Sequence, residues 1–233
     1  MSAMKQTLLE GLPQLGLSLA EETADKLCAF GEAVIAQNEV MNLTAITEPS
    51  AVAKLHLLDS LTVLTAADLN GKTLIDVGCG AGFPGVPVAI ACPNAKVTLL
   101  DSLGKRMTWL ETILPQLGVK ARCITARAEE AISDHREKFD YATSRAVARL
   151  NILLELTAPY VRVGGAVIAL KGSAARQELE EAAGAVKKLG LKVEDIKDFD
   201  IDGATHSVIV LRKITKTPPQ FPRRYAKIKQ SPL

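Results

Sequence analysis

Hydrophobic residues recur every three or four positions through the first 70 residues, which is the spacing of amphipathic helices. One such run begins near Leu8, a second is centred near Phe30, and a third follows Pro49. No stretch in this region has the pattern of a strand. We therefore predict a segment of two or three helices. The positions expected to face inward are Leu8, Leu9, Leu12, Leu15, Leu27, Phe30, Val34, Ile35, Val52, Leu55, Leu58 and Leu61.

From Thr73 onward the pattern changes, because short apolar runs alternate with helical stretches. No helical stretch separates the last two runs, which meet at Asp202-Gly203, so these runs are predicted to form a β-hairpin. The expected strands are residues 74–77, 96–100, 121–125, 139–144, 161–170, 192–199 and 207–212. The expected helices are residues 84–92, 103–117, 128–133, 150–160 and 174–189.

This order of elements predicts an α/β fold with a mostly parallel seven-stranded sheet and helices on both faces. The hairpin adds an antiparallel strand at one side of the sheet. We expect three parts: an N-terminal helical extension packed on the main domain (1–71), the sheet domain (72–216) and a basic, proline-containing C-terminal tail (217–233). The tail holds four of the eleven prolines and has too few apolar residues to fold alone.

The stretch from Thr73 to Gly85 joins the first strand to the next helix through four glycines. Glycine lets the backbone bend sharply and lets a ligand approach with no Cβ in the way. The helix that follows directs free N–H groups and the positive end of its dipole at the turn. The pattern therefore predicts a nucleotide-binding turn, with Gly78 and Gly80 at the ligand.

Two kinds of ligand fit this turn. Gly80-Ala-Gly-Phe-Pro-Gly85 matches the G-x-G-x-x-G pattern of dinucleotide-binding folds. An acidic residue followed by G-x-G-x-G, as at Asp76, is instead typical of S-adenosylmethionine-dependent methyltransferases. There the carboxylate reaches the amino group of the cofactor, whereas a pyrophosphate would repel it. The terminal hairpin and the lack of room for a second domain also favour S-adenosylmethionine, with Asp101 expected at the ribose and Glu129 beside the adenine.

Composition sets limits but does not indicate a function. The 233 residues include 28 Lys and Arg against 26 Asp and Glu, so nucleic-acid binding would have to depend on local basic groups. The four cysteines form no C-x-x-C pair and no zinc-type spacing, and no metal site is expected. No apolar run reaches the ~18 residues of a membrane span, and no secretory leader is recognisable. We expect a soluble, cytoplasmic monomer without a membrane partner.

Seven motifs spread along nearly the whole chain occur together, and in the same order, in one known family. They are Asn42-Leu-Thr-Ala-Ile46, His56-Leu-Leu-Asp-Ser60, Leu74-Ile-Asp-Val-Gly-Cys-Gly-Ala-Gly-Phe-Pro-Gly85, Leu99-Leu-Asp-Ser-Leu-Gly-Lys-Arg106, Arg127-Ala-Glu129, Ser144-Arg-Ala146 and Ala169-Leu-Lys-Gly172. In these motifs the chain resembles the bacterial 16S rRNA guanine-N7 methyltransferases (RsmG, also called GidB). The resemblance implies a Rossmann-like class I methyltransferase that transfers a methyl group from S-adenosyl-L-methionine to N7 of a guanine in 16S rRNA. The implied partner is 16S rRNA or the small ribosomal subunit. By matching motif positions, it also implies that the cofactor is contacted by Gly78, Phe83, Ala128, Glu129 and Arg145.

Guanine N7 has an exposed lone pair and needs no deprotonation before it attacks a methyl group. We therefore expect catalysis by placement and electrostatics, without a general base. Arg145 and Lys171 are the candidate catalytic residues, because they lie at the predicted carboxyl ends of the fourth and fifth strands, where open α/β sheets bind ligands. His56 and Cys79 are interpreted as packed structural residues. The candidate RNA-binding residues are Lys105, Arg106, Arg127, Arg149, Arg223 and Arg224.

Several alternatives stay open at this level. Lys105 and Arg106 could simply be solvated residues at a helix start, and the basic tail could be a solubilising end. The same cofactor pocket could serve another RNA, a protein or a small molecule. The chain could also be a non-enzymatic RNA-binding module with a relict pocket.

Overall fold

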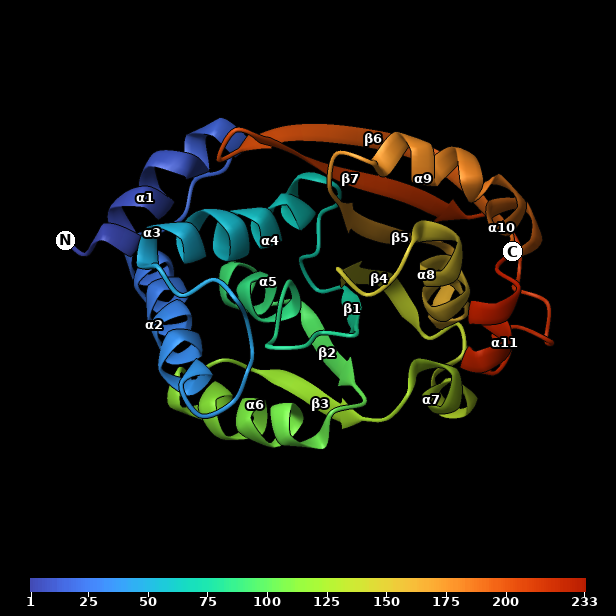
Figure 1. Cartoon of the computed structure of the whole chain (residues 1–233), viewed down its shortest axis with the longest axis horizontal. Coiled ribbons are helices and arrows are strands. Elements are labelled where there is room, and N and C mark those ends of the chain that lie inside the picture. Colours follow the sequence, from blue (N-terminus) through green and yellow to red (C-terminus); the bar gives the residue numbers. More distant parts are fainter.

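The computed structural model describes residues 1–233 and shows a seven-stranded sheet with helices on both faces (Figure 1). The strand order is β3-β2-β1-β4-β5-β7-β6. Pairing is parallel from β3 through β5, whereas β7 runs antiparallel to both β5 and β6. The mostly parallel sheet and its closing hairpin confirm the predicted fold. The strands are β1 (Thr73–Val77), β2 (Lys96–Asp101), β3 (Ala121–Thr125), β4 (Phe139–Arg145), β5 (Val161–Lys171), β6 (Leu191–Ile201) and β7 (Ala204–Lys213).

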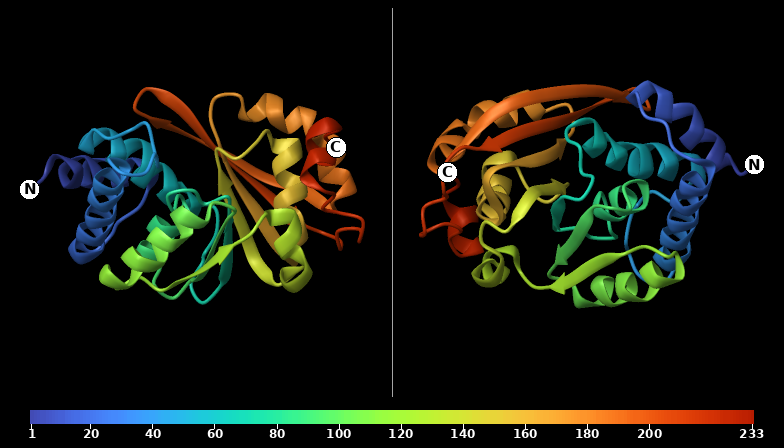
Figure 2. Two further views of the ribbon diagram at one scale, coloured as in Figure 1. Left: turned by 60° about the horizontal axis from the view of Figure 1, so that its bottom comes forward. Right: turned by 180° about the vertical axis from the view of Figure 1, so that it is seen from behind.

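Both faces of the central strands are buried, which explains why the strands are continuous apolar runs. Successive side chains point to opposite faces of a strand. On β1, Leu74 packs in the core that contains Leu99 and Ile168, while Ile75 packs in a second core with Leu100. Figure 2 shows the two helical layers on either side of the sheet.

The first core joins the N-terminal helices to the sheet. Met4, Leu27 and Phe30 belong to the same buried cluster as Leu74 and Leu99, so the extension packs on the main domain. The exact divisions after residues 71 and 216 stay predictions. The helices of this half are α1 (Ala3–Gly11), η1 (Leu12–Leu15), α2 (Glu21–Asn38), α3 (Pro49–Val52), η2 (Ala53–Leu58), α4 (Asp59–Leu61) and η3 (Thr62–Thr65).

The helical run after Glu48 changes its hydrogen-bonding pattern along its length. It starts at a cap formed by the Glu48 side chain, which accepts bonds from the backbone N–H groups of Ser50 and Ala51. The segment η2 is a π-helix, a rare form that is frequent at functional sites. This segment carries His56, and Asp59 follows directly after it. Both residues are buried, although both are polar.

The remaining helices are α5 (Gly85–Ala91), α6 (Gly104–Gln116), α7 (Ala128–His135), α8 (Leu150–Thr157), η4 (Ala158–Tyr160), α9 (Ala175–Glu181), α10 (Ala183–Lys188) and α11 (Tyr225–Gln230). The prediction of one continuous helix over residues 174–189 is wrong, because the chain forms α9 and α10 with a break at Ala182. No helix is both long and apolar enough to cross a membrane.

The C-terminal tail folds against the rest of the protein. Ile228 in α11 is completely buried, and Phe221 is nearly so. The carboxylate of Glu155 in α8 is fully buried and accepts three hydrogen bonds from Arg223. The tail therefore gains its order from contacts with α8, as its low apolar content requires.

Candidate active site

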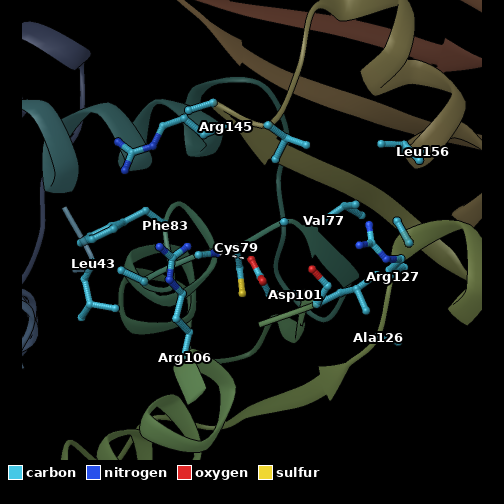
Figure 3. A pocket seen from close by; sticks show the side chains of 18 of the residues that line it. Leu43, Val77, Cys79, Phe83, Asp101, Arg106, Ala126, Arg127, Arg145 and Leu156 are labelled. Carbon is cyan, nitrogen blue, oxygen red and sulfur yellow. Dashed lines mark hydrogen bonds between the residues drawn. The ribbon is translucent and has the colours of Figure 1, made fainter. Parts of the chain in front are cut away.

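A cavity of about 480 Å³ opens at the carboxyl ends of β1, β2 and β4 (Figure 3). Ligands of open α/β sheets bind at this edge, and small-molecule sites have volumes of this order. At one end of the cavity lie Phe83 and Arg145, and at the other lie Ala126, Arg127 and Leu156. The structure brings together most of the predicted cofactor residues. Those in the lining are Gly78, Gly80, Phe83, Asp101, Ala128, Glu129 and Arg145.

The glycine turn forms the floor of this cavity and requires glycine at Gly78. The φ angle of Gly78 is +75°, and a Cβ built there would lie 2.4 Å from a Val147 methyl carbon. Gly80, with φ +57°, donates its N–H to Asp101 at 2.9 Å. The second Asp101 oxygen accepts the N–H of Leu103 at 2.9 Å. Asp101 thus fixes the turn to the end of β2 while its carboxylate still lines the cavity.

Asp76 lies in a different place from the one expected. Its side chain is completely buried behind the turn and does not line the cavity. One carboxyl oxygen accepts the N–H of Gly85 at 2.7 Å, at the start of α5, and the other has no hydrogen-bond partner. Burial raises the pKa of Asp76 to about 7. In this structure the Asp76 carboxyl group holds α5 against the glycine turn, and its contact with the amino group of the cofactor stays a prediction.

Arg145, the last residue of β4, connects the sheet to the N-terminal helices. Its Nη1 atom donates to the Asp59 carboxylate at 2.7 Å and to the Leu55 carbonyl at 2.8 Å. Its guanidinium carbon lies 5.1 Å from the centre of the Phe83 ring. The His56 ring also stacks on the Phe83 ring, with 4.7 Å between the two ring centroids. Ion pairing and stacking together hold the guanidinium at the cavity wall.

The charge states in this cluster follow from burial and pairing. Burial, and after it the positive charge of Arg145, lowers the pKa of His56 to about 4, so the imidazole is neutral at pH 7. Although burial alone would raise the pKa of Asp59, hydrogen bonds from His206 and Arg145 hold it below its usual value. The hydrogen bond to Asp59 in turn raises the pKa of His206. Asp59 is therefore an anion shared by two donors from β4 and β7.

A second cavity, of about 560 Å³, adjoins the first. His56, Arg145, Ala146 and Val147 line both cavities. Ala146 has a φ of +57°, which costs a non-glycine residue roughly 1–2 kcal/mol. Such strain is common at functional sites.

The predicted catalytic residue Lys171 lines only the second cavity, with its ammonium paired to Glu178 at 2.8 Å. Arg149, also in this lining, is paired with Glu181. The structure thus places Lys171 in the second cavity, which Arg145 also lines, and not at the glycine turn.

The predicted RNA-binding residues are not equivalent in the structure. Arg106 and Arg127 line the first cavity, and Lys105 is exposed beside Arg106 at the start of α6. Arg224 is exposed next to the lining residue Tyr225. The Arg223 guanidinium forms a two-point ion pair with the buried Glu155, which gives it a structural role, and its RNA contact stays a prediction.

Two cavity residues were missed from the sequence, and a third has long-range contacts that the sequence does not show. His56, interpreted as a packed structural residue, is buried and contacts Arg145 and Phe83, which lie far away along the chain. Val147 and the tail residue Tyr225 had no local signal at all. Cys79 is buried, and burial raises its thiol pKa well above the usual value, which agrees with its interpretation as a packed residue.

Solved structures with the same arrangement of elements support the fold assignment. TYW2 of M. jannaschii, solved in complex with AdoMet, has a TM-score of 0.56 and 14% sequence identity, over 68% of this chain and 76% of that one. A precorrin-6y C5,15-methyltransferase from Geobacter metallireducens has a TM-score of 0.52 and 12% identity, over 74% and 92%. With the cavity at the glycine turn, this fold is that of the Rossmann-like class I methyltransferases.

The sequence then defines the family. The model of the family described as rRNA small subunit methyltransferase G matches residues 23–208, and the chain belongs to that family. The ribosomal RNA small subunit methyltransferase G of Alkaliphilus metalliredigens is 39% identical over 98% of both chains. That of Desulfitobacterium hafniense is 41% identical over 94% of this chain and 93% of its own.

Proposed function

We propose that this protein transfers a methyl group from S-adenosyl-L-methionine to N7 of a guanine in 16S rRNA of the small ribosomal subunit. Membership in the rRNA small subunit methyltransferase G family supports the reaction class and the RNA substrate. The observation that carries the proposal is the glycine-turn cavity, which shares the Arg145 wall with a second cavity. One cavity suits the cofactor, and the other leaves room for the methyl acceptor.

The residues of the first cavity fit the proposed cofactor. Gly78 lets the turn keep its left-handed backbone conformation at the floor of the cavity, where a Cβ would collide with Val147. The Asp101 carboxylate, which lines the cavity at the end of β2, would accept hydrogen bonds from the ribose hydroxyls. Ala128 and Glu129, in the first turn of α7, would flank the adenine, opposite the end that holds Phe83 and Arg145. When bound, S-adenosyl-L-methionine supplies an electrophilic methyl group on its sulfonium.

The protein's own residues then act by placement. Guanine N7 is already a lone-pair donor, so no side chain has to remove a proton. Arg145 is held by Asp59, the Leu55 carbonyl and Phe83, and this keeps its position fixed between the two cavities. A group held in a fixed position aligns the acceptor with the methyl group. It also stabilises the charge distribution of the transition state. We propose Arg145 in this role and Lys171 as part of the acceptor side.

RNA backbone contacts are proposed for the basic groups around the cavities. Lys105 and Arg224 are exposed, and Arg106, Arg127 and Arg149 line the cavities. Each phosphate contact makes binding weaken with salt. We further propose that the protein acts in the cytoplasm, where small subunits are assembled, as a monomer and without a metal ion.

The test is a methylation assay with labelled S-adenosyl-L-methionine and small subunits or 16S rRNA that lack the modification. The proposal predicts incorporation of label into 16S rRNA at a guanine. Transfer to another RNA or to a protein would replace the proposed substrate. Cofactor binding without any transfer would favour an RNA-binding module with a relict pocket.

A further inference from the structure

The second cavity is lined by groups that already neutralise one another. Lys171 is paired with Glu178, and Arg145 is paired with Asp59. Arg149 at this cavity is likewise paired, with Glu181. Because the shielded cations Lys171 and Arg145 both have anionic partners, the interior of this cavity offers little attraction to a phosphate. It suits a neutral group that carries both hydrogen-bond donors and acceptors. The backbone contact proposed for Arg149 would come from its side chain, which is 55% exposed.

Beside the ion pairs, the lining contains apolar side chains and the rings of His56 and His206, a mixture that suits a flat aromatic ring. Ile46, Leu55, Val147 and Leu170 line this cavity together with the ion pairs. The volume of about 560 Å³ is ample for one nucleotide base with its sugar. Enzymes that modify a base commonly take it out of its stack into such a pocket and identify it through its Watson–Crick edge.

The Lys171–Glu178 pair keeps hydrogen-bonding capacity in reserve. Lys171 and Glu178 side chains are only 8% and 16% exposed, so their contacts are largely shielded from water. Both protein contacts of the Glu178 carboxylate, from the Lys171 ammonium and the Leu150 N–H, fall on Oε2. The Oε1 atom has no protein donor. The Lys171 ammonium also donates to the Ala148 carbonyl at 2.6 Å, which leaves one of its three N–H groups unused.

Guanine presents a matching set of groups. Its N1–H and N2 amino group are donors on the Watson–Crick edge, on the opposite side of the purine from N7. Its O6 is an acceptor next to N1–H, on the side toward N7. If N7 faces the shared wall at Arg145, the Watson–Crick edge faces away from the cofactor cavity, toward α9. Adenine would instead place the N1 lone pair against a carboxylate.

We propose that the second cavity holds the acceptor guanine, with Glu178 Oε1 accepting from N1–H and the N2 amino group and Lys171 donating to O6. This inference deepens the proposed function and rests on it. Glu178 and Lys171 thereby become specificity-determining residues that select guanine over adenine. The strained Ala146 and its neighbour Val147 form the wall through which N7 meets the cofactor cavity.

The experiment compares wild type, Glu178→Gln and the control Glu180→Gln, an exposed residue of the same helix that lines neither cavity. Each is assayed under single-turnover conditions with subunits that carry either guanosine or inosine at the modified position. Inosine lacks only the N2 amino group. We expect inosine to slow wild type and Glu180→Gln roughly 10- to 100-fold, the usual effect of losing a base-edge contact. Glu178→Gln should be slow on guanosine and show little further loss on inosine.

The controls separate the inference from folding and from the proposed function. Glu178→Gln removes the anionic partner of the shielded Lys171 and should lower the melting temperature, so all proteins are assayed well below their melting temperatures. S-adenosyl-L-methionine affinity should be the same in Glu178→Gln and wild type. Equal inosine penalties in wild type and Glu178→Gln would overturn the guanine-reading role, even though wild type methylates guanosine. Methylation of inosine by wild type at the guanosine rate would do the same. No transfer by wild type to either subunit would overturn the proposed function itself.

Discussion

Arg223 and Arg224 are neighbours with the same chemistry, but the structure gives them different environments. The Arg223 guanidinium binds the Glu155 carboxylate through Nε at 2.8 Å and Nη2 at 2.6 Å. Glu155 is 0% exposed and Arg223 is 22% exposed. Arg224 is exposed and has no such partner. The pair therefore offers a matched comparison between loss of a buried ion pair and loss of a surface charge.

Arg223→Ala leaves the Glu155 carboxylate buried, with only the backbone N–H of residue 223 as a donor. Removing one partner of a buried pair costs about 3–5 kcal/mol. For a chain of this length, 3 kcal/mol corresponds to a fall in Tm of roughly 6–12 °C. Arg224→Ala should change the free energy of unfolding by less than about 0.5 kcal/mol. Urea unfolding and thermal melting measure both effects.

A double variant tests the cause of the loss. If the penalty comes from a stranded charge, Glu155→Gln in the Arg223→Ala background removes that charge and should recover part of the stability. Arg223→Ala should also weaken RNA binding only in proportion to unfolding, whereas Arg224→Ala should weaken it in the folded protein. Equal stabilities of Arg223→Ala and Arg224→Ala would refute the reasoning. So would a Glu155→Gln change that lowers the stability of Arg223→Ala further.

Three other predictions follow from the site. Gly78→Ala should reduce the S-adenosyl-L-methionine affinity measured by calorimetry at least tenfold, since its Cβ would lie 2.4 Å from a Val147 methyl carbon. The control Gly71→Ala, at φ +70° with no neighbour within 4 Å of its Cβ, should leave this affinity unchanged. The Asp76 pKa is raised to about 7 from 3.8, so the free energy of unfolding should fall by up to ~4 kcal/mol as the pH rises from about 4 to 7. Asp76→Asn should lack this part of the pH dependence, and urea-unfolding profiles that change with pH in the same way in Asp76→Asn and wild type would contradict the prediction. Lys105→Ala should lower the slope of log RNA affinity against log salt by about 0.7–0.9 with unchanged cofactor affinity, and an unchanged slope would exclude a phosphate contact.

The fold could be predicted from the sequence because its signals are local. Alternating apolar runs and helical stretches indicated the strands, and Asp202-Gly203 indicated the hairpin that the structure contains. The glycine turn follows the end of β1, and Asp101 is the last residue of β2. Because the ends of neighbouring parallel strands meet at one edge of a sheet, the predicted strands were enough to bring the turn and Asp101 together.

The rest of the site depends on contacts that local patterns do not contain. His56 contacts Arg145 across 89 residues, and the approach requires the π-helical segment η2 to pack on the sheet. Tyr225 reaches the cavity only because the tail docks on α8. For Asp76, the sequence gives its position before the turn but not the direction of its side chain, which points to Gly85 in the structure.

The most direct test of the account is to map the methylated atom. Small subunits that lack the modification are incubated with the protein and S-adenosyl-L-methionine, and the 16S rRNA is digested and analysed by mass spectrometry. We predict one new 7-methylguanosine, formed in much lower yield at limiting cofactor when Gly78→Ala replaces the wild-type protein. A methyl group on another atom or another RNA, or no methyl group at all, would contradict it.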